Sequence, residues 1–331
     1  MKIGALDLGE RPLLLAPMED VTDVSFRVLC REQGAAVVYT EFVNSDGLVR
    51  DVPKTIAKMH TLEEEAPVGV QIYGQHPDAM VDAARMAERA AELTGGHGAD
   101  LVDINFGCPV SKIAGRGAGS GMMREPDKMV AITKAVVEAV GKPVTVKTRL
   151  GWDDNSRIIV ELAERLQDVG IAALTIHGRT RCQLYKGEAD WTLIGAVKAN
   201  PRMHIPIIGN GDITDGPSAK QAFERYGVDG IMIGRATFGH PWIFREIRHY
   251  LDHGEPMPAL TVAEKVALAR RHLALSLQYK GEPRGIYEMR RHLSCYFKGL
   301  PDFKETRMRM VTTLDVAELN DILDTIEQRY D

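Results

Sequence analysis

The sequence of 331 residues has few cysteines, few aromatic residues and no long apolar run. Its cysteines, Cys30, Cys108, Cys182 and Cys295, are too far apart for a C-x-x-C metal pair or for the disulfide framework of a small secreted domain. No apolar run approaches the length that spans a bilayer, and the N-terminus lacks the apolar core and cleavage site of a signal peptide. We therefore expect a cytoplasmic protein with free thiols, no metal site and no membrane partner.

The sequence also lacks a strong charge of either sign, since its net charge is -5, and it lacks a dinucleotide-binding glycine fingerprint after its first predicted strand. Hydrophobic residues make up 44% and charged residues 26%, as in a soluble globular protein without disordered segments. The length allows one α/β domain of roughly 250 residues and a smaller module.

The first 250 residues alternate short β-branched runs with longer segments of helical periodicity, which is typical of repeated βα units. The runs that predict strands are 13–18, 37–43, 68–74, 101–107, 143–149, 173–178, 205–211 and 230–235. Eight parallel strands with crossover helices favour a (β/α)8 TIM barrel over a doubly wound sheet. We expect the barrel to occupy residues 1–250.

The remaining chain predicts a smaller all-α C-terminal domain. Gly and Pro interrupt the periodicity at 251–261, which we interpret as a linker, and helical patterns fill 262–331. Residues 265–309 hold eleven Lys or Arg against four acidic residues. This excess indicates either a phosphate-binding face or an ordinary solvated helical surface, and the pattern alone leaves both open.

The predicted strands end in polar residues, although a buried strand gains no stability from an unpartnered polar group. In a TIM barrel the carboxyl ends of the strands build the active site. The polar side chains at or near these ends are Glu41, Gln71, Asn105, Lys147, Arg149, His177, Asn210 and Arg235. Each has an ordinary structural explanation by itself, but the set together predicts a binding site.

The last two strands end in "GNGDI" and "IGRA", where many barrels hold a phosphate through backbone N–H groups. Simple turn glycines are the alternative interpretation. This set of groups suits flavin mononucleotide (FMN). It consists of amides on the third and fourth predicted strands, Lys147 on the fifth, His177 on the sixth and a phosphate site at the seventh and eighth.

Cys108 follows the fourth predicted strand directly, which places its thiol at the mouth of the barrel. The residues leave three roles open: a buried structural thiol, a nucleophile paired with a base, and a general acid. The glycine-rich segment 115–121 after it does not match a P-loop. With Lys112, Arg116 and Arg124 beside its glycines, we interpret it as a mobile cationic lid for a polyanionic substrate.

Taken together, these motifs resemble the flavin-dependent tRNA-dihydrouridine synthases of bacteria, of a B-type-like subfamily. The ordered stretches that carry the resemblance are "LAPMEDVTDVSFR", "VQIYG", "DINFGCPVSKIAGRGAGSGMMR", "VKTRLGW", "LTIHGRTRCQLYKGEADW", "IGNGDI", "IMIGRATFGHPWIF" and "RRHLSCYFKGLP". They cover nearly the whole chain.

The resemblance implies an FMN-binding barrel, a helical domain that grips tRNA, NADPH as reductant and Cys108 as the acid that protonates C5 of a uridine. The cofactor residues that it implies, together with the strand-end argument, are Ala16, Pro17, Met18, Gln71, Asn105, Lys147, His177, Asn210, Gly211, Asp212, Gly234 and Arg235. For tRNA we expect contacts from Lys112, Arg116, Arg179, Arg290 and Arg291. No protein partner is evident, and we expect a monomer.

Two departures from the family pattern bear on substrate choice. Glu19 and Asp20 stand where many relatives have small residues, and Ser111 replaces a frequent Lys. Two other functions remain as alternatives: a flavin-dependent reductase or dehydrogenase of a free pyrimidine, similar to dihydroorotate dehydrogenase, and a non-catalytic RNA-binding flavoprotein. The basic tail argues against the first, because a small substrate needs no such surface.

Overall fold

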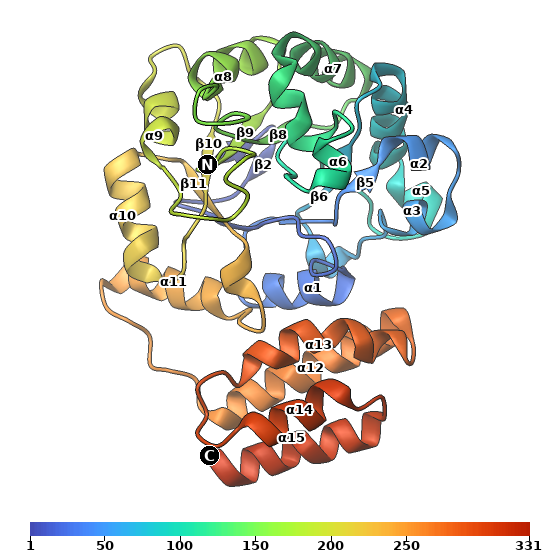
Figure 1. Ribbon diagram of the computed structural model, residues 1–331, viewed down its shortest axis with the longest axis vertical. Coiled ribbons are helices and arrows are strands. Elements are labelled where there is room, and N and C mark those ends of the chain that lie inside the picture. Colours follow the sequence, from blue (N-terminus) through green and yellow to red (C-terminus); the bar gives the residue numbers. More distant parts are fainter.

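A computed structural model describes all residues from 1 to 331, and Figure 1 shows a barrel with a separate group of C-terminal helices below it. The barrel strands are β3 (Leu13–Leu15), β4 (Val38–Tyr39), β6 (Val68–Tyr73), β7 (Leu101–Asn105), β8 (Val144–Arg149), β9 (Ala173–His177), β10 (Ile207–Asn210) and β11 (Gly230–Ile233). They pair in parallel in the order β3-β11-β10-β9-β8-β7-β6-β4, and a parallel bridge from Leu14 to Val37 closes the ring. The prediction of a TIM barrel is confirmed.

The second strand differs from its prediction. The segment predicted as one strand, 37–43, divides into β4 and the separate β5 (Val43–Asn44), and both of these pair with β6. A hairpin of β1 (Lys2–Ile3) and β2 (Leu6–Asp7), which the sequence did not predict, adds Ile3 to a buried cluster with Leu14 and Leu101. The hairpin therefore covers the amino-terminal end of the barrel, opposite the strand ends that carry the polar residues.

Helices surround the barrel because the outward-facing strand residues are apolar. The helices of this layer are α1 (Val24–Glu32), α2 (Ser45–Val49), α3 (Pro53–Ala57), α4 (Pro77–Glu88), α5 (Ala90–Thr94), α6 (Ser111–Ala114), α7 (Pro126–Ala139), α8 (Ile159–Asp168), α9 (Thr192–Ala199), α10 (Gly216–Tyr226) and α11 (Ile243–His253). Val102 and Val146 of the strands share one core of 52 buried residues with Leu162 and Leu166 of α8. This burial of apolar surface is the main favourable contribution to the stability of the barrel.

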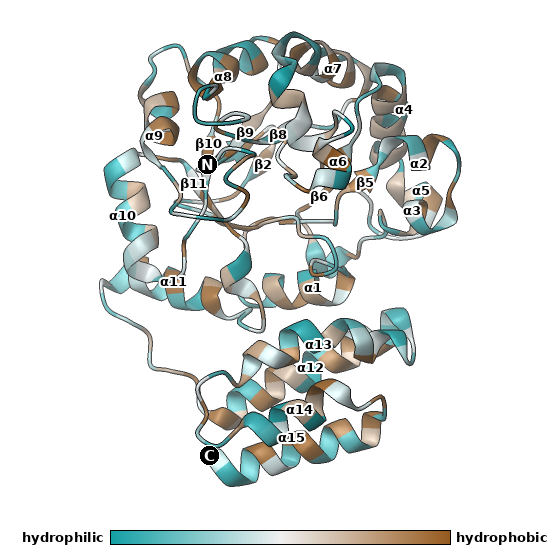
Figure 2. Cartoon of the chain, viewed as in Figure 1, coloured by the Kyte–Doolittle hydropathy of each residue, from teal (hydrophilic) through white to brown (hydrophobic).

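The C-terminal residues form α12 (Val262–Lys280), α13 (Arg284–Tyr296), α14 (Lys304–Thr312) and α15 (Val316–Tyr330). Thr261 and Glu264 form a capping box that starts α12, as the sequence pattern of an N-terminal cap predicts. These helices carry apolar and polar stretches along their length (Figure 2) and enclose a second core of 16 buried residues. No helix in the structure is both long and apolar enough to cross a membrane.

The C-terminal helices contact the barrel mainly through α1. The ring of Phe26 lies 5.4 Å from His272 and 4.2 Å from His292, centroid to centroid. The Lys280 ammonium forms ion pairs with Asp23 of the barrel and with Glu288 of its own helical group. Direct charge pairing and aromatic packing thus hold the two parts together.

Candidate active site

The interior of the barrel consists of an apolar floor and polar layers above it. On β7 the inward-facing side chains after Leu101 are Asp103 and Asn105, and the strand register places Thr145 beside Asp103 and Lys147 beside Asn105. The outward residues between them are apolar, so the period of two in each strand separates the core from the interior. The polar strand ends predicted from the sequence therefore face a common space.

That space is a cavity of about 640 Å³ at the carboxyl ends of the strands. Cys108 lines it, with most of the predicted cofactor residues: Ala16, Pro17, Met18, Asn105, Lys147, His177, Asn210, Gly211, Asp212, Gly234 and Arg235. Gln71 does not line the cavity, because it lies fully buried in the layer beneath. The barrel closure brings these residues together from strands that are far apart in the sequence.

Lys147 places an ammonium group in this interior without an ion pair. Its Nζ donates a hydrogen bond to Asn210 Oδ1 at 3.1 Å, and Asn210 Nδ2 donates to the carbonyl of Met232 at 2.8 Å. Burial, assisted by the nearby Arg149 guanidinium, lowers the pKa of Lys147 to about 8. The amine therefore remains largely protonated at neutral pH and faces the cavity without a carboxylate partner.

His177 contributes a neutral imidazole to the cavity wall. Burial lowers its pKa well below the usual range, and the Arg149 and Lys147 cations lower it further. Its Nδ1 atom is buried and has no hydrogen-bond partner. A buried polar atom without a partner costs free energy unless a ligand satisfies it.

The far end of the cavity has the glycines expected for a phosphate site. Gly211 adopts φ of +125°, which a residue with a side chain rarely adopts. Asp212 does not face the cavity as a free carboxylate, because Arg179, Arg235 and the Ala189 N–H bind it. Arg235 remains half-exposed at the mouth.

The expected contact between Arg179 and tRNA is corrected by the structure. The side chain is 1% exposed, and its guanidinium binds the Asp212 carboxylate at 2.6 Å and the backbone carbonyls of Lys186 and Gly187. All of these acceptors belong to the protein. Arg179 therefore links the loops that follow β9 and β10, and its guanidinium does not face solvent.

Cys108 lies at the edge of the cavity with a thiol that remains protonated at neutral pH. Burial raises the pKa of the thiol, although Arg149 and Lys147 act in the opposite direction. Its N–H donates to Asn105 Oδ1 at 2.9 Å, and its carbonyl accepts hydrogen bonds from the N–H and the hydroxyl of Ser120. Since no histidine nitrogen bonds to the sulfur, the geometry favours a proton donor over a base-activated nucleophile.

The glycine-rich segment, which we interpreted as a mobile cationic lid, has regular structure. The segment folds into α6 and a 3-10 helix, η2 (Gly119–Arg124), whose Met122 and Met123 are buried. A Cβ at Gly119 would lie 3.0 Å from the Cys108 carbonyl oxygen, and one at Gly121 would lie 2.4 Å from that of Ala114. The glycines thus permit close packing around Cys108.

Exposed cations surround the mouth, and sequence reasoning missed the aromatic group that organises two of them. The guanidinium carbons of Arg124 and Arg181 lie 4.2 and 4.7 Å from the centre of the Trp152 ring. The only sequence signal for Trp152 is its place in "VKTRLGW". Lys112 and Arg116 are exposed nearby and form no ion pair.

The helical part adds further cations on another side of the mouth. Arg291 lines the cavity and lies over Phe238, whereas Arg290 lies over Tyr287 and donates to the Thr312 carbonyl. Of this predicted pair, only Arg291 therefore reaches the cavity itself.

Of the two acidic departures near the cavity, Glu19 forms an ion pair and Asp20 does not. The Lys58 ammonium lies 2.5 Å from a Glu19 oxygen and 3.8 Å from a Glu41 oxygen, and Glu41 also accepts the Asp20 N–H. The hydroxyl of Ser111 accepts a hydrogen bond from Arg181 at 3.4 Å. Glu19 lines the cavity and shares the Lys58 ammonium with Glu41.

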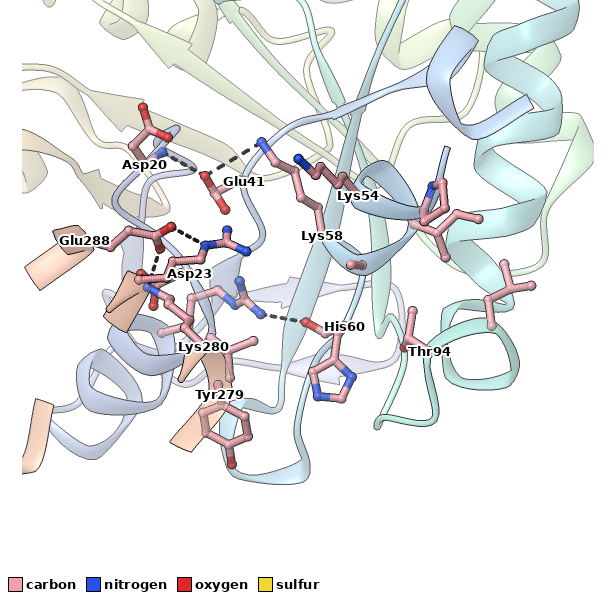
Figure 3. A pocket seen from close by; sticks show the side chains of 17 residues that line it. Asp20, Asp23, Glu41, Lys54, Lys58, His60, Thr94, Tyr279, Lys280 and Glu288 are labelled. Atoms are coloured by element: carbon pink, nitrogen blue, oxygen red, sulfur yellow. Dashed lines mark hydrogen bonds and ion pairs between the residues drawn. The ribbon is translucent and has the colours of Figure 1, made fainter. Parts of the chain in front are cut away.

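A larger hollow of about 920 Å³ lies between the barrel and the C-terminal helices (Figure 3). Several of its charged side chains pair with one another: Lys58 pairs with Glu41, and Lys280 pairs with Asp23 and Glu288. Because these charges have partners within the protein, we place the candidate active site in the smaller cavity around Cys108.

Comparison with known proteins agrees with this geometry. The family described as "Dihydrouridine synthase (Dus)" matches residues 14–330. The chain is 40% identical to a tRNA-dihydrouridine synthase B of Pseudomonas aeruginosa over 99% of this chain and 93% of that protein, and 43% identical to one of Proteus vulgaris over 90% and 89%. An old yellow enzyme homologue from Zymomonas mobilis shares the fold at 14% identity with a TM-score of 0.52, covering 78% of this chain and 92% of that one. The resemblance inferred from the sequence motifs is confirmed, and the chain belongs to the dihydrouridine synthase family.

Proposed function

We propose that the protein reduces the C5–C6 double bond of a specific uridine in tRNA, with FMN as its resident cofactor and NADPH as the reductant. The observation that carries the proposal is the protonated Cys108 thiol at the edge of a cavity whose wall holds the Lys147 ammonium without an ion pair and the His177 Nδ1 atom without a hydrogen-bond partner. Family membership supports the same reaction.

The cavity residues fit FMN chemically. Gly211 and Gly234 carry no side chains at the end where a phosphate would lie, and Arg235 lies beside them with a half-exposed guanidinium. Lys147 and the orphaned Nδ1 atom of His177 are polar groups that a ring edge would satisfy. Bound FMN would supply the hydride, and the Lys147 ammonium would favour negative charge on the ring.

Cys108 would supply the proton in the same reduction. With a hydride supplied to C6 of the uracil ring, the Cys108 S–H bond would break and its proton would form the new C–H bond at C5, which balances a two-electron reduction. The Arg149 and Lys147 cations stabilise the thiolate that remains. Exchange with solvent would return a proton to the thiolate before the next turnover.

The cations around the mouth would hold the RNA while the target base leaves its stack. Arg124 and Arg181 on Trp152, with Lys112 and Arg116, offer charge on the barrel side. Arg290 and Arg291 offer it on the side of the helical part, for which we propose a tRNA-binding role. We further propose that the protein acts as a monomer in the cytoplasm.

The decisive test combines a spectrum with a map of modified bases. The purified protein should absorb as a flavoprotein, and loss of its gene should remove dihydrouridine from defined tRNA positions while sparing others. A colourless protein, together with unchanged tRNA dihydrouridine, would overturn the proposal. Turnover of a free pyrimidine at a rate equal to that of tRNA would favour the dihydroorotate dehydrogenase-like alternative, and binding without turnover would favour a non-catalytic flavoprotein.

A further inference from the structure

Asp103 is an unusual buried carboxylate at the centre of the barrel. Only two acidic side chains are classed as buried, Glu65 and Asp103, and Glu65 forms an ion pair with Arg27. Asp103 is 1% exposed and forms no ion pair. Burial raises its pKa to about 6, so that it is mainly ionised at neutral pH. Burying an ionised carboxylate without an ion pair costs free energy, so we expect a role of Asp103 other than packing.

A chain of hydrogen bonds runs from this carboxylate to the backbone of Cys108. Asp103 Oδ2 accepts from Gln71 Nε2 at 2.6 Å, and Gln71 Oε1 accepts from Asn105 Nδ2 at 2.8 Å. Asn105 Oδ1 then accepts the N–H groups of Gly107 at 3.0 Å and Cys108 at 2.9 Å. The register of β6, β7 and β8 aligns Gln71, Asp103 and Thr145 in one row, and the Thr145 hydroxyl donates to the other carboxylate oxygen at 2.5 Å.

The two ends of this chain allow one orientation of the two amides between them. An ionised carboxylate only accepts hydrogen bonds, and a backbone N–H only donates. If Gln71 or Asn105 turned over, two donors or two acceptors would face each other in a buried site, at a cost of about 1–3 kcal/mol. The carboxylate at one end therefore determines which atom of Asn105 meets the Cys108 backbone at the other.

We propose that Asp103 is a positioning residue, which acts through Gln71 and Asn105 to fix the backbone that carries the Cys108 thiol. Ser120 holds the Cys108 carbonyl from the other side, so the residue is restrained at both of its peptide groups. The same orientation leaves the second N–H of Asn105 free as a donor at the cavity wall. The catalytic consequence rests on the proposed function, whereas the restraint on the thiol does not.

The test measures the alkylation rate of Cys108 in the full chain as purified. Cys182 is exposed and Cys295 is half-buried, so both are first replaced by Ser; the buried Cys30 can stay. Iodoacetamide labelling at Cys108 is then followed by peptide mass spectrometry. In this background we expect Asp103→Leu, which removes the acceptor at similar volume, to raise the labelling rate at least twofold because the Cys108 backbone is released.

Two matched variants separate this role from general damage to the barrel. Asp103→Asn keeps an oxygen for Gln71 if the Thr145 hydroxyl turns, and Thr145→Val removes only the other hydrogen bond of the carboxylate. We expect both to label within twofold of the parent. A change below twofold in Asp103→Leu, or an equal rise in Thr145→Val, would overturn the proposal. If Asp103→Leu does not fold, Gln71→Leu interrupts the same series of hydrogen bonds at its middle. We then expect the same rise of at least twofold in the labelling rate of Cys108.

Turnover provides a second readout. In the Asp103→Leu enzyme kcat for tRNA should fall at least tenfold while KM remains within twofold, because the acid is displaced and the RNA surface is intact. If the parent enzyme reduces no uridine, the proposed function fails but the labelling result still decides the role of Asp103. If the parent is active and labelling is unchanged in Asp103→Leu, only this inference fails.

Discussion

Charge is buried in two regions of this molecule, and the two regions treat it differently. Where α1 meets the C-terminal helices, the Lys280 ammonium pairs directly with Asp23 and Glu288. Inside the barrel, Lys147 and Asp103 affect each other's pKa but form no ion pair. The Lys280 charge thus completes a contact within the protein, whereas Lys147 and Asp103 leave their charges for a ligand or for neighbouring polar groups. The active site contains both kinds, because Asp212 there forms ion pairs with Arg179 and Arg235.

The first test removes the proposed proton donor from the cavity and leaves the interface between α1 and the C-terminal helices unchanged. Cys108→Ala should lower the turnover of tRNA about 10²–10⁴-fold, which is the usual contribution of a general acid. The flavin spectrum and the affinity for tRNA should remain within twofold, measured by absorbance and filter binding. Turnover within tenfold of the parent enzyme would show that the proton comes from another group.

The second way is to remove one cation from each region. Lys280→Met leaves Asp23 and Glu288 without their shared cation, so it should lower the free energy of unfolding by about 3 kcal/mol. Lys147→Met removes a buried charge that has no ion pair, so it should leave that free energy unchanged or raise it. Urea unfolding of both variants without added cofactor measures the contrast. Equal destabilisation would break the comparison.

The third test uses pH at the interface. Burial lowers the pKa of His292 to about 4, against about 6.5 in an unfolded chain. The unfolded state therefore binds more protons between these values, and stability is lost as the pH falls from about 6.5 towards 4. We expect about 2 kcal/mol of this loss at pH 5, seen as faster hydrogen exchange in α12 and α13.

Two histidine variants assign that pH dependence. His292→Asn should remove most of the contribution that this residue makes, and His204→Gln, which alters an exposed histidine, should not change it. Hydrogen exchange in α12 and α13 that is the same at pH 7 and pH 5 in the parent protein would contradict the assignment.

The smallest effect is expected at the mouth. Arg124→Ala removes one cation that has no ion pair, so the affinity for tRNA should fall a few-fold and the slope of log K against log salt should shrink by about one. Arg85→Ala, on the exposed face of α4, is the matched control and should leave both unchanged. If the slope of log K against log salt in Arg124→Ala equals that of the parent protein, this arginine does not belong to the RNA-binding surface.

The strand ends were predictable from the sequence because the carboxyl ends of parallel strands converge on one side of a barrel. Asn105, Lys147, His177 and Asn210 accordingly line one cavity. Gln71 was expected there too, but the local pattern cannot tell at which layer a side chain stops. The hairpin of β1 and β2 escaped prediction because two-residue strands have no measurable periodicity.

Composition did not reveal the partners of two features near the site. Arg179 was expected at the RNA surface as a cation in a loop, yet its acceptor Asp212 lies 33 residues along the chain. The glycines near Cys108 were interpreted as hinges of a lid, and the structure shows that they allow backbone segments to pack closely. In both cases the missing information was which atoms meet.

The sequence by itself determined the barrel, the helices that follow it and the place of Cys108 after the fourth predicted strand, because local periodicity and strand order suffice for these. Only the tertiary structure decided which charges are paired and how the amides of Gln71 and Asn105 are turned. Those features depend on hydrogen bonds and ion pairs a few ångströms long between residues that stand 30 to 260 positions apart. The physical reason is that electrostatic and hydrogen-bond energies depend on contact geometry, which no local pattern of residues encodes.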